Sequence, residues 1–269
     1  MKIAVVGVGN LGSVLVEKII GAGATPKDLV LVHRKSVQHD DLGTRFGCRI
    51  VSSLTHLGSS ATFDLVLIAV KPQDAEEACT DIRPFVSGST VVLSVMAGIT
   101  VARLADLLGH AKIARAMPTL GAMVSESATT FFCSDTLSSD DCGAVEKILS
   151  TFGRCWRVAR EELIDVATAV AGSGPAYFCW LAEQIEAVAV ESGFSAEDAH
   201  QILVQTLHGT AAYLKCSATP FSVLRQRVTS HKGTTHAAIS LLQQHEADVV
   251  VKEAVRAALR RARELGDDK

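Results

Sequence analysis

The hexapeptide Gly7-Val8-Gly9-Asn10-Leu11-Gly12 decides the fold of this chain. It directly follows an apolar run with the pattern of a strand, and it opens an amphipathic stretch, Leu11 to Ala22, with the pattern of a helix. In this setting the glycines have separate tasks: a tight turn at Gly7, close approach of a pyrophosphate at Gly9, and close helix-to-strand packing at Gly12. The sequence therefore predicts a dinucleotide-binding turn, with Gly7, Gly9, Asn10, Leu11 and Gly12 as cofactor-binding residues. A glycine-rich turn without a ligand is the alternative.

Short apolar runs alternate with amphipathic stretches over the first 160 residues, which is typical of a parallel sheet covered by helices. The expected strands are Ile3 to Val6, Leu29 to Val32, Leu65 to Ala69, Val91 to Val95, Ile113 to Ala116, Ala128 to Phe132 and Cys155 to Val158. After Arg160 the pattern changes to long helices, expected at Leu163 to Val170, Pro175 to Ser192, Ala196 to Lys215, Gly233 to Gln244 and Val249 to Leu265. We predict an α/β protein with a Rossmann-type doubly wound parallel sheet in residues 1–160 and an all-helical dimerisation domain in residues 161–269.

The expected helices of the second half carry apolar residues on more than one face. In the helix from Pro175 to Ser192, for example, Leu181, Ile185 and Val188 to Val190 do not form a single stripe. A single layer of such helices would expose a large apolar surface. The pattern therefore predicts a homodimer or a higher homo-oligomer.

A basic run, His33-Arg34-Lys35-Ser36, follows the second expected strand. NAD-specific proteins of this type place an acidic residue here to bind the ribose hydroxyls. Arg34 can instead form paired hydrogen bonds with a 2′-phosphate, while Lys35 adds charge and Ser36 a hydroxyl donor. We therefore predict NADPH as the cofactor and NADH as its alternative. A solvated basic loop is the competing interpretation.

Composition excludes several classes of function. The 269 residues are 48% hydrophobic and 20% charged, with a formal net charge of -3, so neither nucleic acid nor a membrane surface is an expected partner. The seven cysteines are odd in number and never at CxxC spacing, which favours reduced thiols and a cytoplasmic location. No run of 18 apolar residues occurs, so we expect no membrane span. The nine histidines lack compact ligand spacing, so we predict no metal site.

Four stretches occur in the order and spacing of one enzyme family: Leu67 to Gln73 (LIAVKPQ), Ser94 to Thr100 (SVMAGIT), Arg115 to Pro118 (RAMP) and Ala171 to Tyr177 (AGSGPAY). With them the chain resembles the pyrroline-5-carboxylate reductases over nearly its whole length. The resemblance implies an NADPH-dependent imine oxidoreductase that reduces a cyclic imino acid, L-1-pyrroline-5-carboxylate, to L-proline in proline biosynthesis. It also implies cofactor contacts by Val70, Lys71, Pro72, Ala97 and Gly98.

The substrate side is expected on two segments. Gly-Ser-Gly before Pro175 leaves backbone N–H groups free at a helix N-terminus, which favours substrate binding by Ser173 and Gly174, with a packing kink as the alternative. The run Thr229 to Thr235 (TSHKGTT) is similar to the family's TSPGGTT-like loop, which holds the substrate carboxylate. The resemblance implies substrate binding by Ser230, Gly233, Thr234 and Thr235, with Ser230 and Thr235 as catalytic residues.

Within this loop we expect Thr235 to hydrogen-bond the ring nitrogen, while a helix-capping role is its alternative. His231 and Lys232 replace the family's Pro-Gly pair, which predicts an altered loop backbone. Together with Thr119-Leu120-Gly121 in place of the family's usual residues, this change makes reduction of a different cyclic imine an alternative function.

Hydride transfer to a protonated imine depends mainly on positioning, with reacting atoms about 3–3.5 Å apart. A β-hydroxyacid dehydrogenase, which has a related architecture, carries a catalytic lysine where this chain has Phe178, so that alternative lacks its proton carrier. Metal-assisted hydrolysis lacks a ligand set. A non-catalytic NADPH-binding regulator that has lost its imine site is the remaining alternative.

Overall fold

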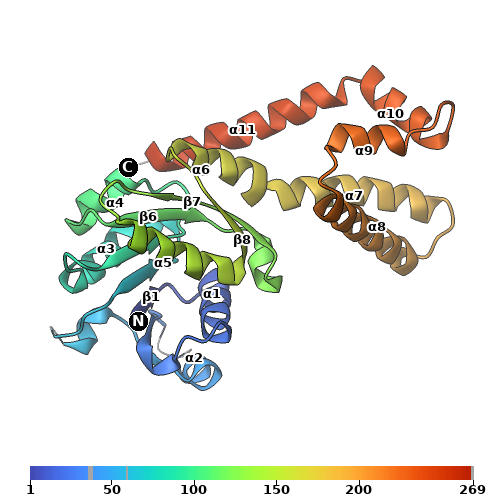
Figure 1. Cartoon of the computed structure of the whole chain (residues 1–269). Helices are drawn as coiled ribbons and strands as arrows, with labels where there is room; N and C mark the ends of the chain where they lie inside the picture. Colours follow the sequence, from blue (N-terminus) through green and yellow to red (C-terminus); the bar gives the residue numbers. More distant parts are fainter. Residues whose placement is uncertain (36–38, 59, 268–269) are drawn as a thin grey trace. The chain divides into compact units, whose positions relative to one another are not determined.

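The computed structural model of the chain describes residues 1–35, 39–58 and 60–267 (Figure 1). The chain forms two compact units. The first consists of Met1–Gly172 together with Ala258–Lys269, and the second of Ser173–Ala257. None of the helices in the described ranges is both long and apolar enough to cross a membrane.

An eight-stranded sheet in the order β3-β2-β1-β4-β5-β6-β7-β8 forms the centre of the first unit. Its strands are β1 (Ile3–Val6), β2 (Leu29–Val32), β3 (Arg49–Val51), β4 (Leu65–Ile68), β5 (Val91–Ser94), β6 (Ile113–Met117), β7 (Ser127–Cys133) and β8 (Gly153–Arg157). Strands β1 to β6 are parallel. This confirms the predicted fold class, an α/β chain with a Rossmann-type sheet.

The last two strands correct the expectation of an entirely parallel sheet. Strand β7 pairs antiparallel with β6, and β8 pairs parallel with β7. The cause is the length of the connections: β6 and β7 are joined by a short segment built around the 3-10 turn Leu120–Val124, whereas a parallel return needs a crossover of a dozen or more residues. The β7–β8 connection contains a full helix and does return parallel.

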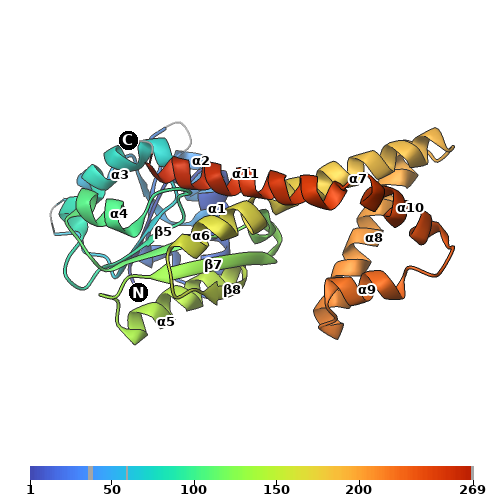
Figure 2. The same ribbon diagram turned by 90° about the horizontal axis from the view of Figure 1, so that it is seen from above.

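Helices cover both faces of the sheet, as Figures 1 and 2 show. Residues Ile3 and Val5 of β1 pack in one buried cluster with helices α1 (Asn10–Gly21) and α5 (Ser139–Leu149), while Ala4 and Val6 pack in a second with α3 (Ala75–Ile82) and α4 (Val101–Leu108). Strands buried on both faces are continuous apolar runs, which is why β1, β2 and β4 were predicted from the sequence. Helix α2 (His39–Phe46) leads to the short strand β3, which the apolar pattern missed.

A buried arginine attaches helix α6 (Glu162–Ala167) to the sheet. Arg115 of β6 is 1% exposed and forms ion pairs with Glu161 (3.1 Å) and Asp165 (2.7 Å), and the Glu161 carboxylate also accepts a hydrogen bond from Val101 N. The chain then continues through the π-helical turn Thr168–Gly172. These contacts place residues 161–172 in the first unit, whereas the sequence analysis placed the domain boundary at residue 160.

The end of helix α11 (Ala247–Asp267) also belongs to the first unit. Gly98 has φ +79°, and a side chain there would come within 2.9 Å of the Leu265 backbone. A side chain at Gly266 would in turn meet the Gly98 carbonyl oxygen at 2.6 Å. Two glycines therefore let the loop after β5 and the end of α11 pack backbone against backbone.

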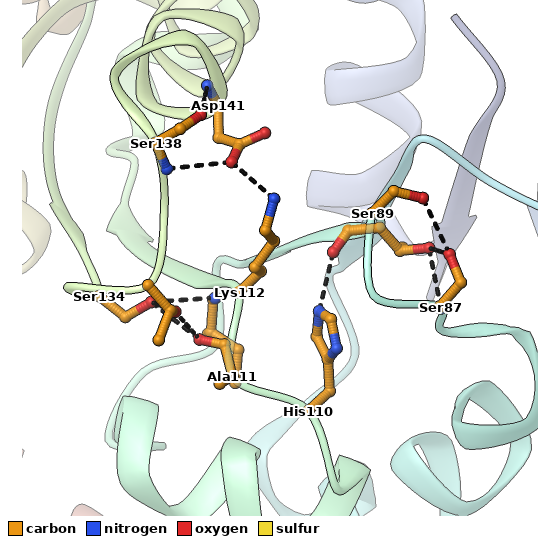
Figure 3. A network of polar contacts seen from close by, with 11 residues as sticks. Ser87, Ser89, His110, Ala111, Lys112, Ser134, Ser138 and Asp141 are labelled. Carbon is orange, nitrogen blue, oxygen red and sulfur yellow. Dashed lines mark hydrogen bonds and ion pairs between the residues drawn. The ribbon is translucent and has the colours of Figure 1, made fainter.

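Polar contacts connect the segments that precede β5 and β6 and follow β7 (Figure 3). The His110 ring bonds the Thr90 carbonyl oxygen at 2.8 Å, and Lys112 forms an ion pair with Asp141 at 3.0 Å. Asp141 also closes a capping box with Ser138 at the start of α5. The hydrogen bond from Lys112 is the largest cause of a lowered pKa at the Asp141 carboxyl.

The second unit is entirely helical, as predicted. It contains α7 (Gly174–Glu191), α8 (Ala196–Ser217), α9 (Phe221–Arg227), α10 (Thr234–Gln244) and the first part of α11. Helix α9 was not expected from the sequence. In the whole of Ser173–Ala257, Gly174 and Ala199 are the two buried residues, while Phe178, Trp180 and Val188 are each more than 60% exposed. This unit has almost no core of its own within one chain.

Candidate cofactor and substrate sites

The glycine-rich turn has the geometry that its sequence predicts. Gly7 has φ +97°, and a Cβ atom there would lie 2.6 Å from Val70 N. A Cβ atom on Gly12 would lie 2.1 Å from the Gly7 carbonyl oxygen, so helix α1 and the turn meet at a distance that only glycine permits. Gly9, the N-cap of α1, has no atom within 4 Å of its Cβ position. The turn is therefore tight on its protein side and open at Gly9.

A cavity of about 940 Å³ lies beside this turn in the first unit. It is lined by Val6–Gly9, Val32–Lys35, Ser52, Ser53, Thr55, Ala69–Lys71, Asp74, Glu77, Ala78, Thr80 and Asp81. These residues follow the carboxyl ends of β1, β2, β3 and β4, because the sheet order places those strands side by side. Dinucleotides bind at this edge of open α/β sheets.

The cavity includes part of the predicted cofactor set. Gly7, Gly9, Arg34, Lys35, Val70 and Lys71 line it. Asn10, Leu11, Gly12, Pro72, Ala97 and Gly98 do not, although Gly12 shapes the turn and Gly98 packs against α11. Ser36 lies outside the described residues.

Arg34 is paired with two carboxylates inside the cavity wall. Its Nη2 lies 2.8 Å from Asp74 Oδ1 and its Nη1 lies 2.6 Å from Glu77 Oε2. The hydrogen bond that the guanidinium donates to Asp74 is the largest cause of its raised pKa, followed by the charges of Asp74 and Glu77. The sequence analysis predicted Arg34 as a phosphate ligand but missed both acidic partners, which come from the 3-10 turn Pro72–Asp74 and from α3.

The polar wall after β3 was also missed. Asp81 of α3 accepts hydrogen bonds from Ser53 Oγ and from Leu54 N (2.9 Å), which fixes the start of the 3-10 turn Leu54–Leu57. Ser52, Ser53 and Thr55 thereby line the cavity. The signal available in the sequence was the polar run Ser52-Ser53 immediately after Arg49-Ile50-Val51, at the end of a strand too short to recognise.

The predicted substrate loop precedes α10 in the second unit. A turn closes through Gly233 N to Ser230 O at 3.0 Å, and a Cβ atom at Gly233 would lie 2.3 Å from Ser230 Oγ, so a side chain there would displace the Ser230 hydroxyl. Gly233 is the N-cap of α10 and no side chain caps the helix, so the first N–H groups, including that of Thr235, have no partner within the helix. The capping alternative for Thr235 is wrong, because the helix begins one residue before it.

Lys232, which replaces the family's glycine, has an unusual backbone conformation. Its φ is +60°, in the left-handed region that glycine favours, so the lysine itself adopts a glycine-like conformation. The neighbouring rings of His231 and His236 meet edge to face with centroids 5.9 Å apart. The loop thus carries an exposed cation beside the open N-terminus of α10.

The predicted pair Ser173 and Gly174 lies at the start of α7. Ser173 is the N-cap without a side-chain capping bond, and Gly174 is buried with no atom within 4 Å of its Cβ position. In the first unit, the preceding Gly172 has a packing role, since a Cβ atom there would lie 2.6 Å from Met117 Cε.

Comparison with known proteins gives consistent results. The family model for pyrroline-5-carboxylate reductase dimerisation matches residues 161–265, and that for ketopantoate reductase PanE/ApbA matches residues 3–134. A pyrroline-5-carboxylate reductase structure from Coxiella burnetii has a TM-score of 0.88 and 28% identity, with 98% of each chain covered. The Plasmodium falciparum pyrroline carboxylate reductase with NADP bound has a TM-score of 0.86 and 25% identity, covering 99% of this chain and 98% of the other.

Pyrroline-5-carboxylate reductase 1 of Bacillus subtilis is 30% identical over 270 residues, which cover 99% of this chain and 90% of the relative. The motifs that carried the resemblance are therefore part of a match that extends through both units. The chain belongs to the pyrroline-5-carboxylate reductase family.

Proposed function

We propose that the protein is an NADPH-dependent reductase that converts L-1-pyrroline-5-carboxylate to L-proline. The observation that carries the proposal is the 30% identity with Bacillus subtilis pyrroline-5-carboxylate reductase 1 over almost the full length of both chains. Fold, cofactor-type cavity and substrate-type loop all agree with this activity. Proline biosynthesis is the corresponding metabolic role.

The residues around the cavity fit a dinucleotide. The open position at Gly9, beside a turn that a Cβ at Gly7 or Gly12 would obstruct, lets backbone N–H groups approach a pyrophosphate. Arg34 and Lys35 stand at the end of β2, where the adenosine ribose is recognised, and Val70 and Lys71 extend the wall. When bound, NADPH supplies the hydride for the imine carbon.

The loop before α10 is proposed to bind the substrate carboxylate. The unpaired N–H groups and positive end of the helix attract an anion, and the hydroxyls of Ser230, Thr234 and Thr235 add donors. Each charge-assisted hydrogen bond contributes about 1.5–3 kcal/mol. Thr235 is assigned to the ring nitrogen, and Ser173 and Gly174 are retained as further substrate contacts. Catalysis by these residues is chiefly orientation of the imine.

We further propose a homodimer or higher homo-oligomer formed through the second unit. A unit that folds alone needs a buried core, whereas only Gly174 and Ala199 of residues 173–257 are buried here. A second copy supplies the missing apolar partner. The seven free cysteines fit a reducing compartment, so the cytoplasm is the proposed location.

A panel of cyclic imines tests the activity. Purified protein is assayed for NADPH oxidation with pyrroline-5-carboxylate, pyrroline-2-carboxylate and piperideine carboxylates, and the highest kcat/KM is expected with the first. Thr235→Ala should lower kcat/KM by about tenfold or more while NADPH affinity, measured by calorimetry, stays unchanged. The matched control is Thr210→Ala, which removes a hydroxyl that bonds the Thr206 carbonyl within α8.

Two outcomes contradict the proposal. Higher turnover of another imine assigns the site to that substrate. Tight NADPH binding without turnover of any imine assigns the chain to a regulatory role.

A further inference from the structure

The charges that line the cofactor-type cavity cancel. Its formally charged lining residues are Arg34, Lys35 and Lys71, with three positive charges, and Asp74, Glu77 and Asp81, with three negative charges. The formal charges of these described residues therefore balance. The end of β2 is therefore not the strongly positive site that its basic sequence suggests.

Both terminal nitrogens of Arg34 are engaged. Asp74 accepts from Nη2 and Glu77 from Nη1, and the two carboxylates lie three residues apart at the start of α3, so that both reach the end of β2. The pairs are partly exposed, with Arg34 at 55% and Glu77 at 68%. Exposed pairs of this kind are weak, so a ligand can displace them.

We propose that Asp74 and Glu77 are specificity-determining residues that restrain Arg34 and weaken recognition of a 2′-phosphate. This inference rests on the proposed binding of NADPH. A dianionic phosphate that approaches Arg34 has to replace at least one carboxylate and meets the repulsion of both. An unphosphorylated ribose meets no such repulsion, and its hydroxyls can donate to a carboxylate in this place. The acidic pair therefore limits the preference for NADPH over NADH.

The expected effect of each carboxylate on 2′-phosphate affinity follows from Coulomb's law. A carboxylate about 6 Å from a dianion in water lowers its affinity by about tenfold without salt and by about three- to fourfold at 0.1 M salt. Removing Glu77 should therefore raise 2′-phosphate affinity three- to fourfold, and removing both carboxylates should raise it by about tenfold. The gain should shrink at 0.5 M salt, because screening weakens the repulsion.

Calorimetry with two nucleotides tests the inference without turnover. The Kd values of 2′,5′-ADP and 5′-ADP are measured for the wild type, Glu77→Gln, Asp74→Asn/Glu77→Gln, and Arg34→Met. The matched control is Glu76→Gln, which removes the neighbouring carboxylate of the same helix, paired with Arg103 and absent from the cavity wall. Steady-state assays add a second readout: the ratio of KM for NADPH to KM for NADH should fall in Glu77→Gln.

The expected result is a selectivity for 2′,5′-ADP that rises in Glu77→Gln, rises further in the double variant, falls in Arg34→Met and is unchanged in Glu76→Gln. Unchanged or reduced selectivity in Glu77→Gln overturns the inference, since the carboxylates would then be irrelevant or would organise Arg34 for phosphate. A wild type that binds neither nucleotide contradicts the proposed function instead. Selectivity that does not depend on Arg34 overturns the inference while leaving the reductase activity intact.

Discussion

Arg115→Met should destabilise the protein far more than the loss of an ordinary ion pair. The Arg115 side chain is 1% exposed, its guanidinium bonds Glu161 at 3.1 Å and Asp165 at 2.7 Å, and within the described residues its Nε has no partner. The substitution leaves the neighbouring carboxylates of Glu161 and Asp165 without their cation. Removing one partner of a buried pair costs about 3–5 kcal/mol. For a chain of this size that predicts a fall in Tm of roughly 6–20 °C.

The assay is thermal and urea unfolding followed by circular dichroism, with Arg103→Met as the matched control. Arg103 forms an ion pair with Glu76, but these side chains are 45% and 71% exposed, so its loss should cost about 1 kcal/mol or less. Nucleotide affinity should persist in both variants at temperatures where they are folded, because neither arginine lines the cavity. If Arg115→Met lowers the free energy of unfolding no more than Arg103→Met does, this arginine does not hold α6 on the sheet.

Three further predictions concern local geometry. Lys232→Gly should be more stable than Lys232→Met by about 1 kcal/mol in urea unfolding, because only glycine relieves the left-handed φ of +60°; equal stabilities would contradict this. The lowered pKa of Asp141 means that its contribution is present above about pH 4 and is lost as pH falls through the lower folded-state pKa, so the stability gap between wild type and Asp141→Asn should narrow as the pH falls below about 4. Gly9→Ala should keep its Tm yet bind 5′-ADP at least tenfold more weakly, whereas Gly12→Ala should also unfold earlier, since only the latter meets protein atoms.

Much of the sheet was predictable because its central strands are buried on both faces. The runs Ile3 to Val6 and Leu29 to Val32 coincide with β1 and β2. Strand β3 escaped detection because only Val51 of its three residues is buried. Helix α9 escaped because its seven residues make only about two turns, too few for a helical period to be recognised. An apolar run does not indicate the direction of its strand. The antiparallel direction of β7 follows instead from the short connection that precedes it.

The site was predictable to the extent that it depends on local backbone. The glycine turn needs a particular conformation at Gly7 and a close approach at Gly12, and both constraints are visible as residue types. Asp74 and Glu77 were missed because acidic residues are common at the start of any helix, where they stabilise its dipole. Their presence there therefore did not indicate a contact with Arg34. They contact Arg34 because the order of strands in the sheet brings together segments about 40 residues apart in sequence. No local sequence pattern indicates that contact.

The close contact of Gly98 with Leu265 and Gly266 has a consequence for biosynthesis of the chain. Residues 173–257 are inserted between the two segments that build the first unit. Domains commonly fold in the order in which they leave the ribosome, N-terminal first. Here the first unit can form most of its sheet early, but the residues that complete its packing are synthesised only after all of residues 173–257. A nascent chain therefore exposes the surface around Gly98 until α11 has emerged, and this surface is where we expect chaperones to bind during translation.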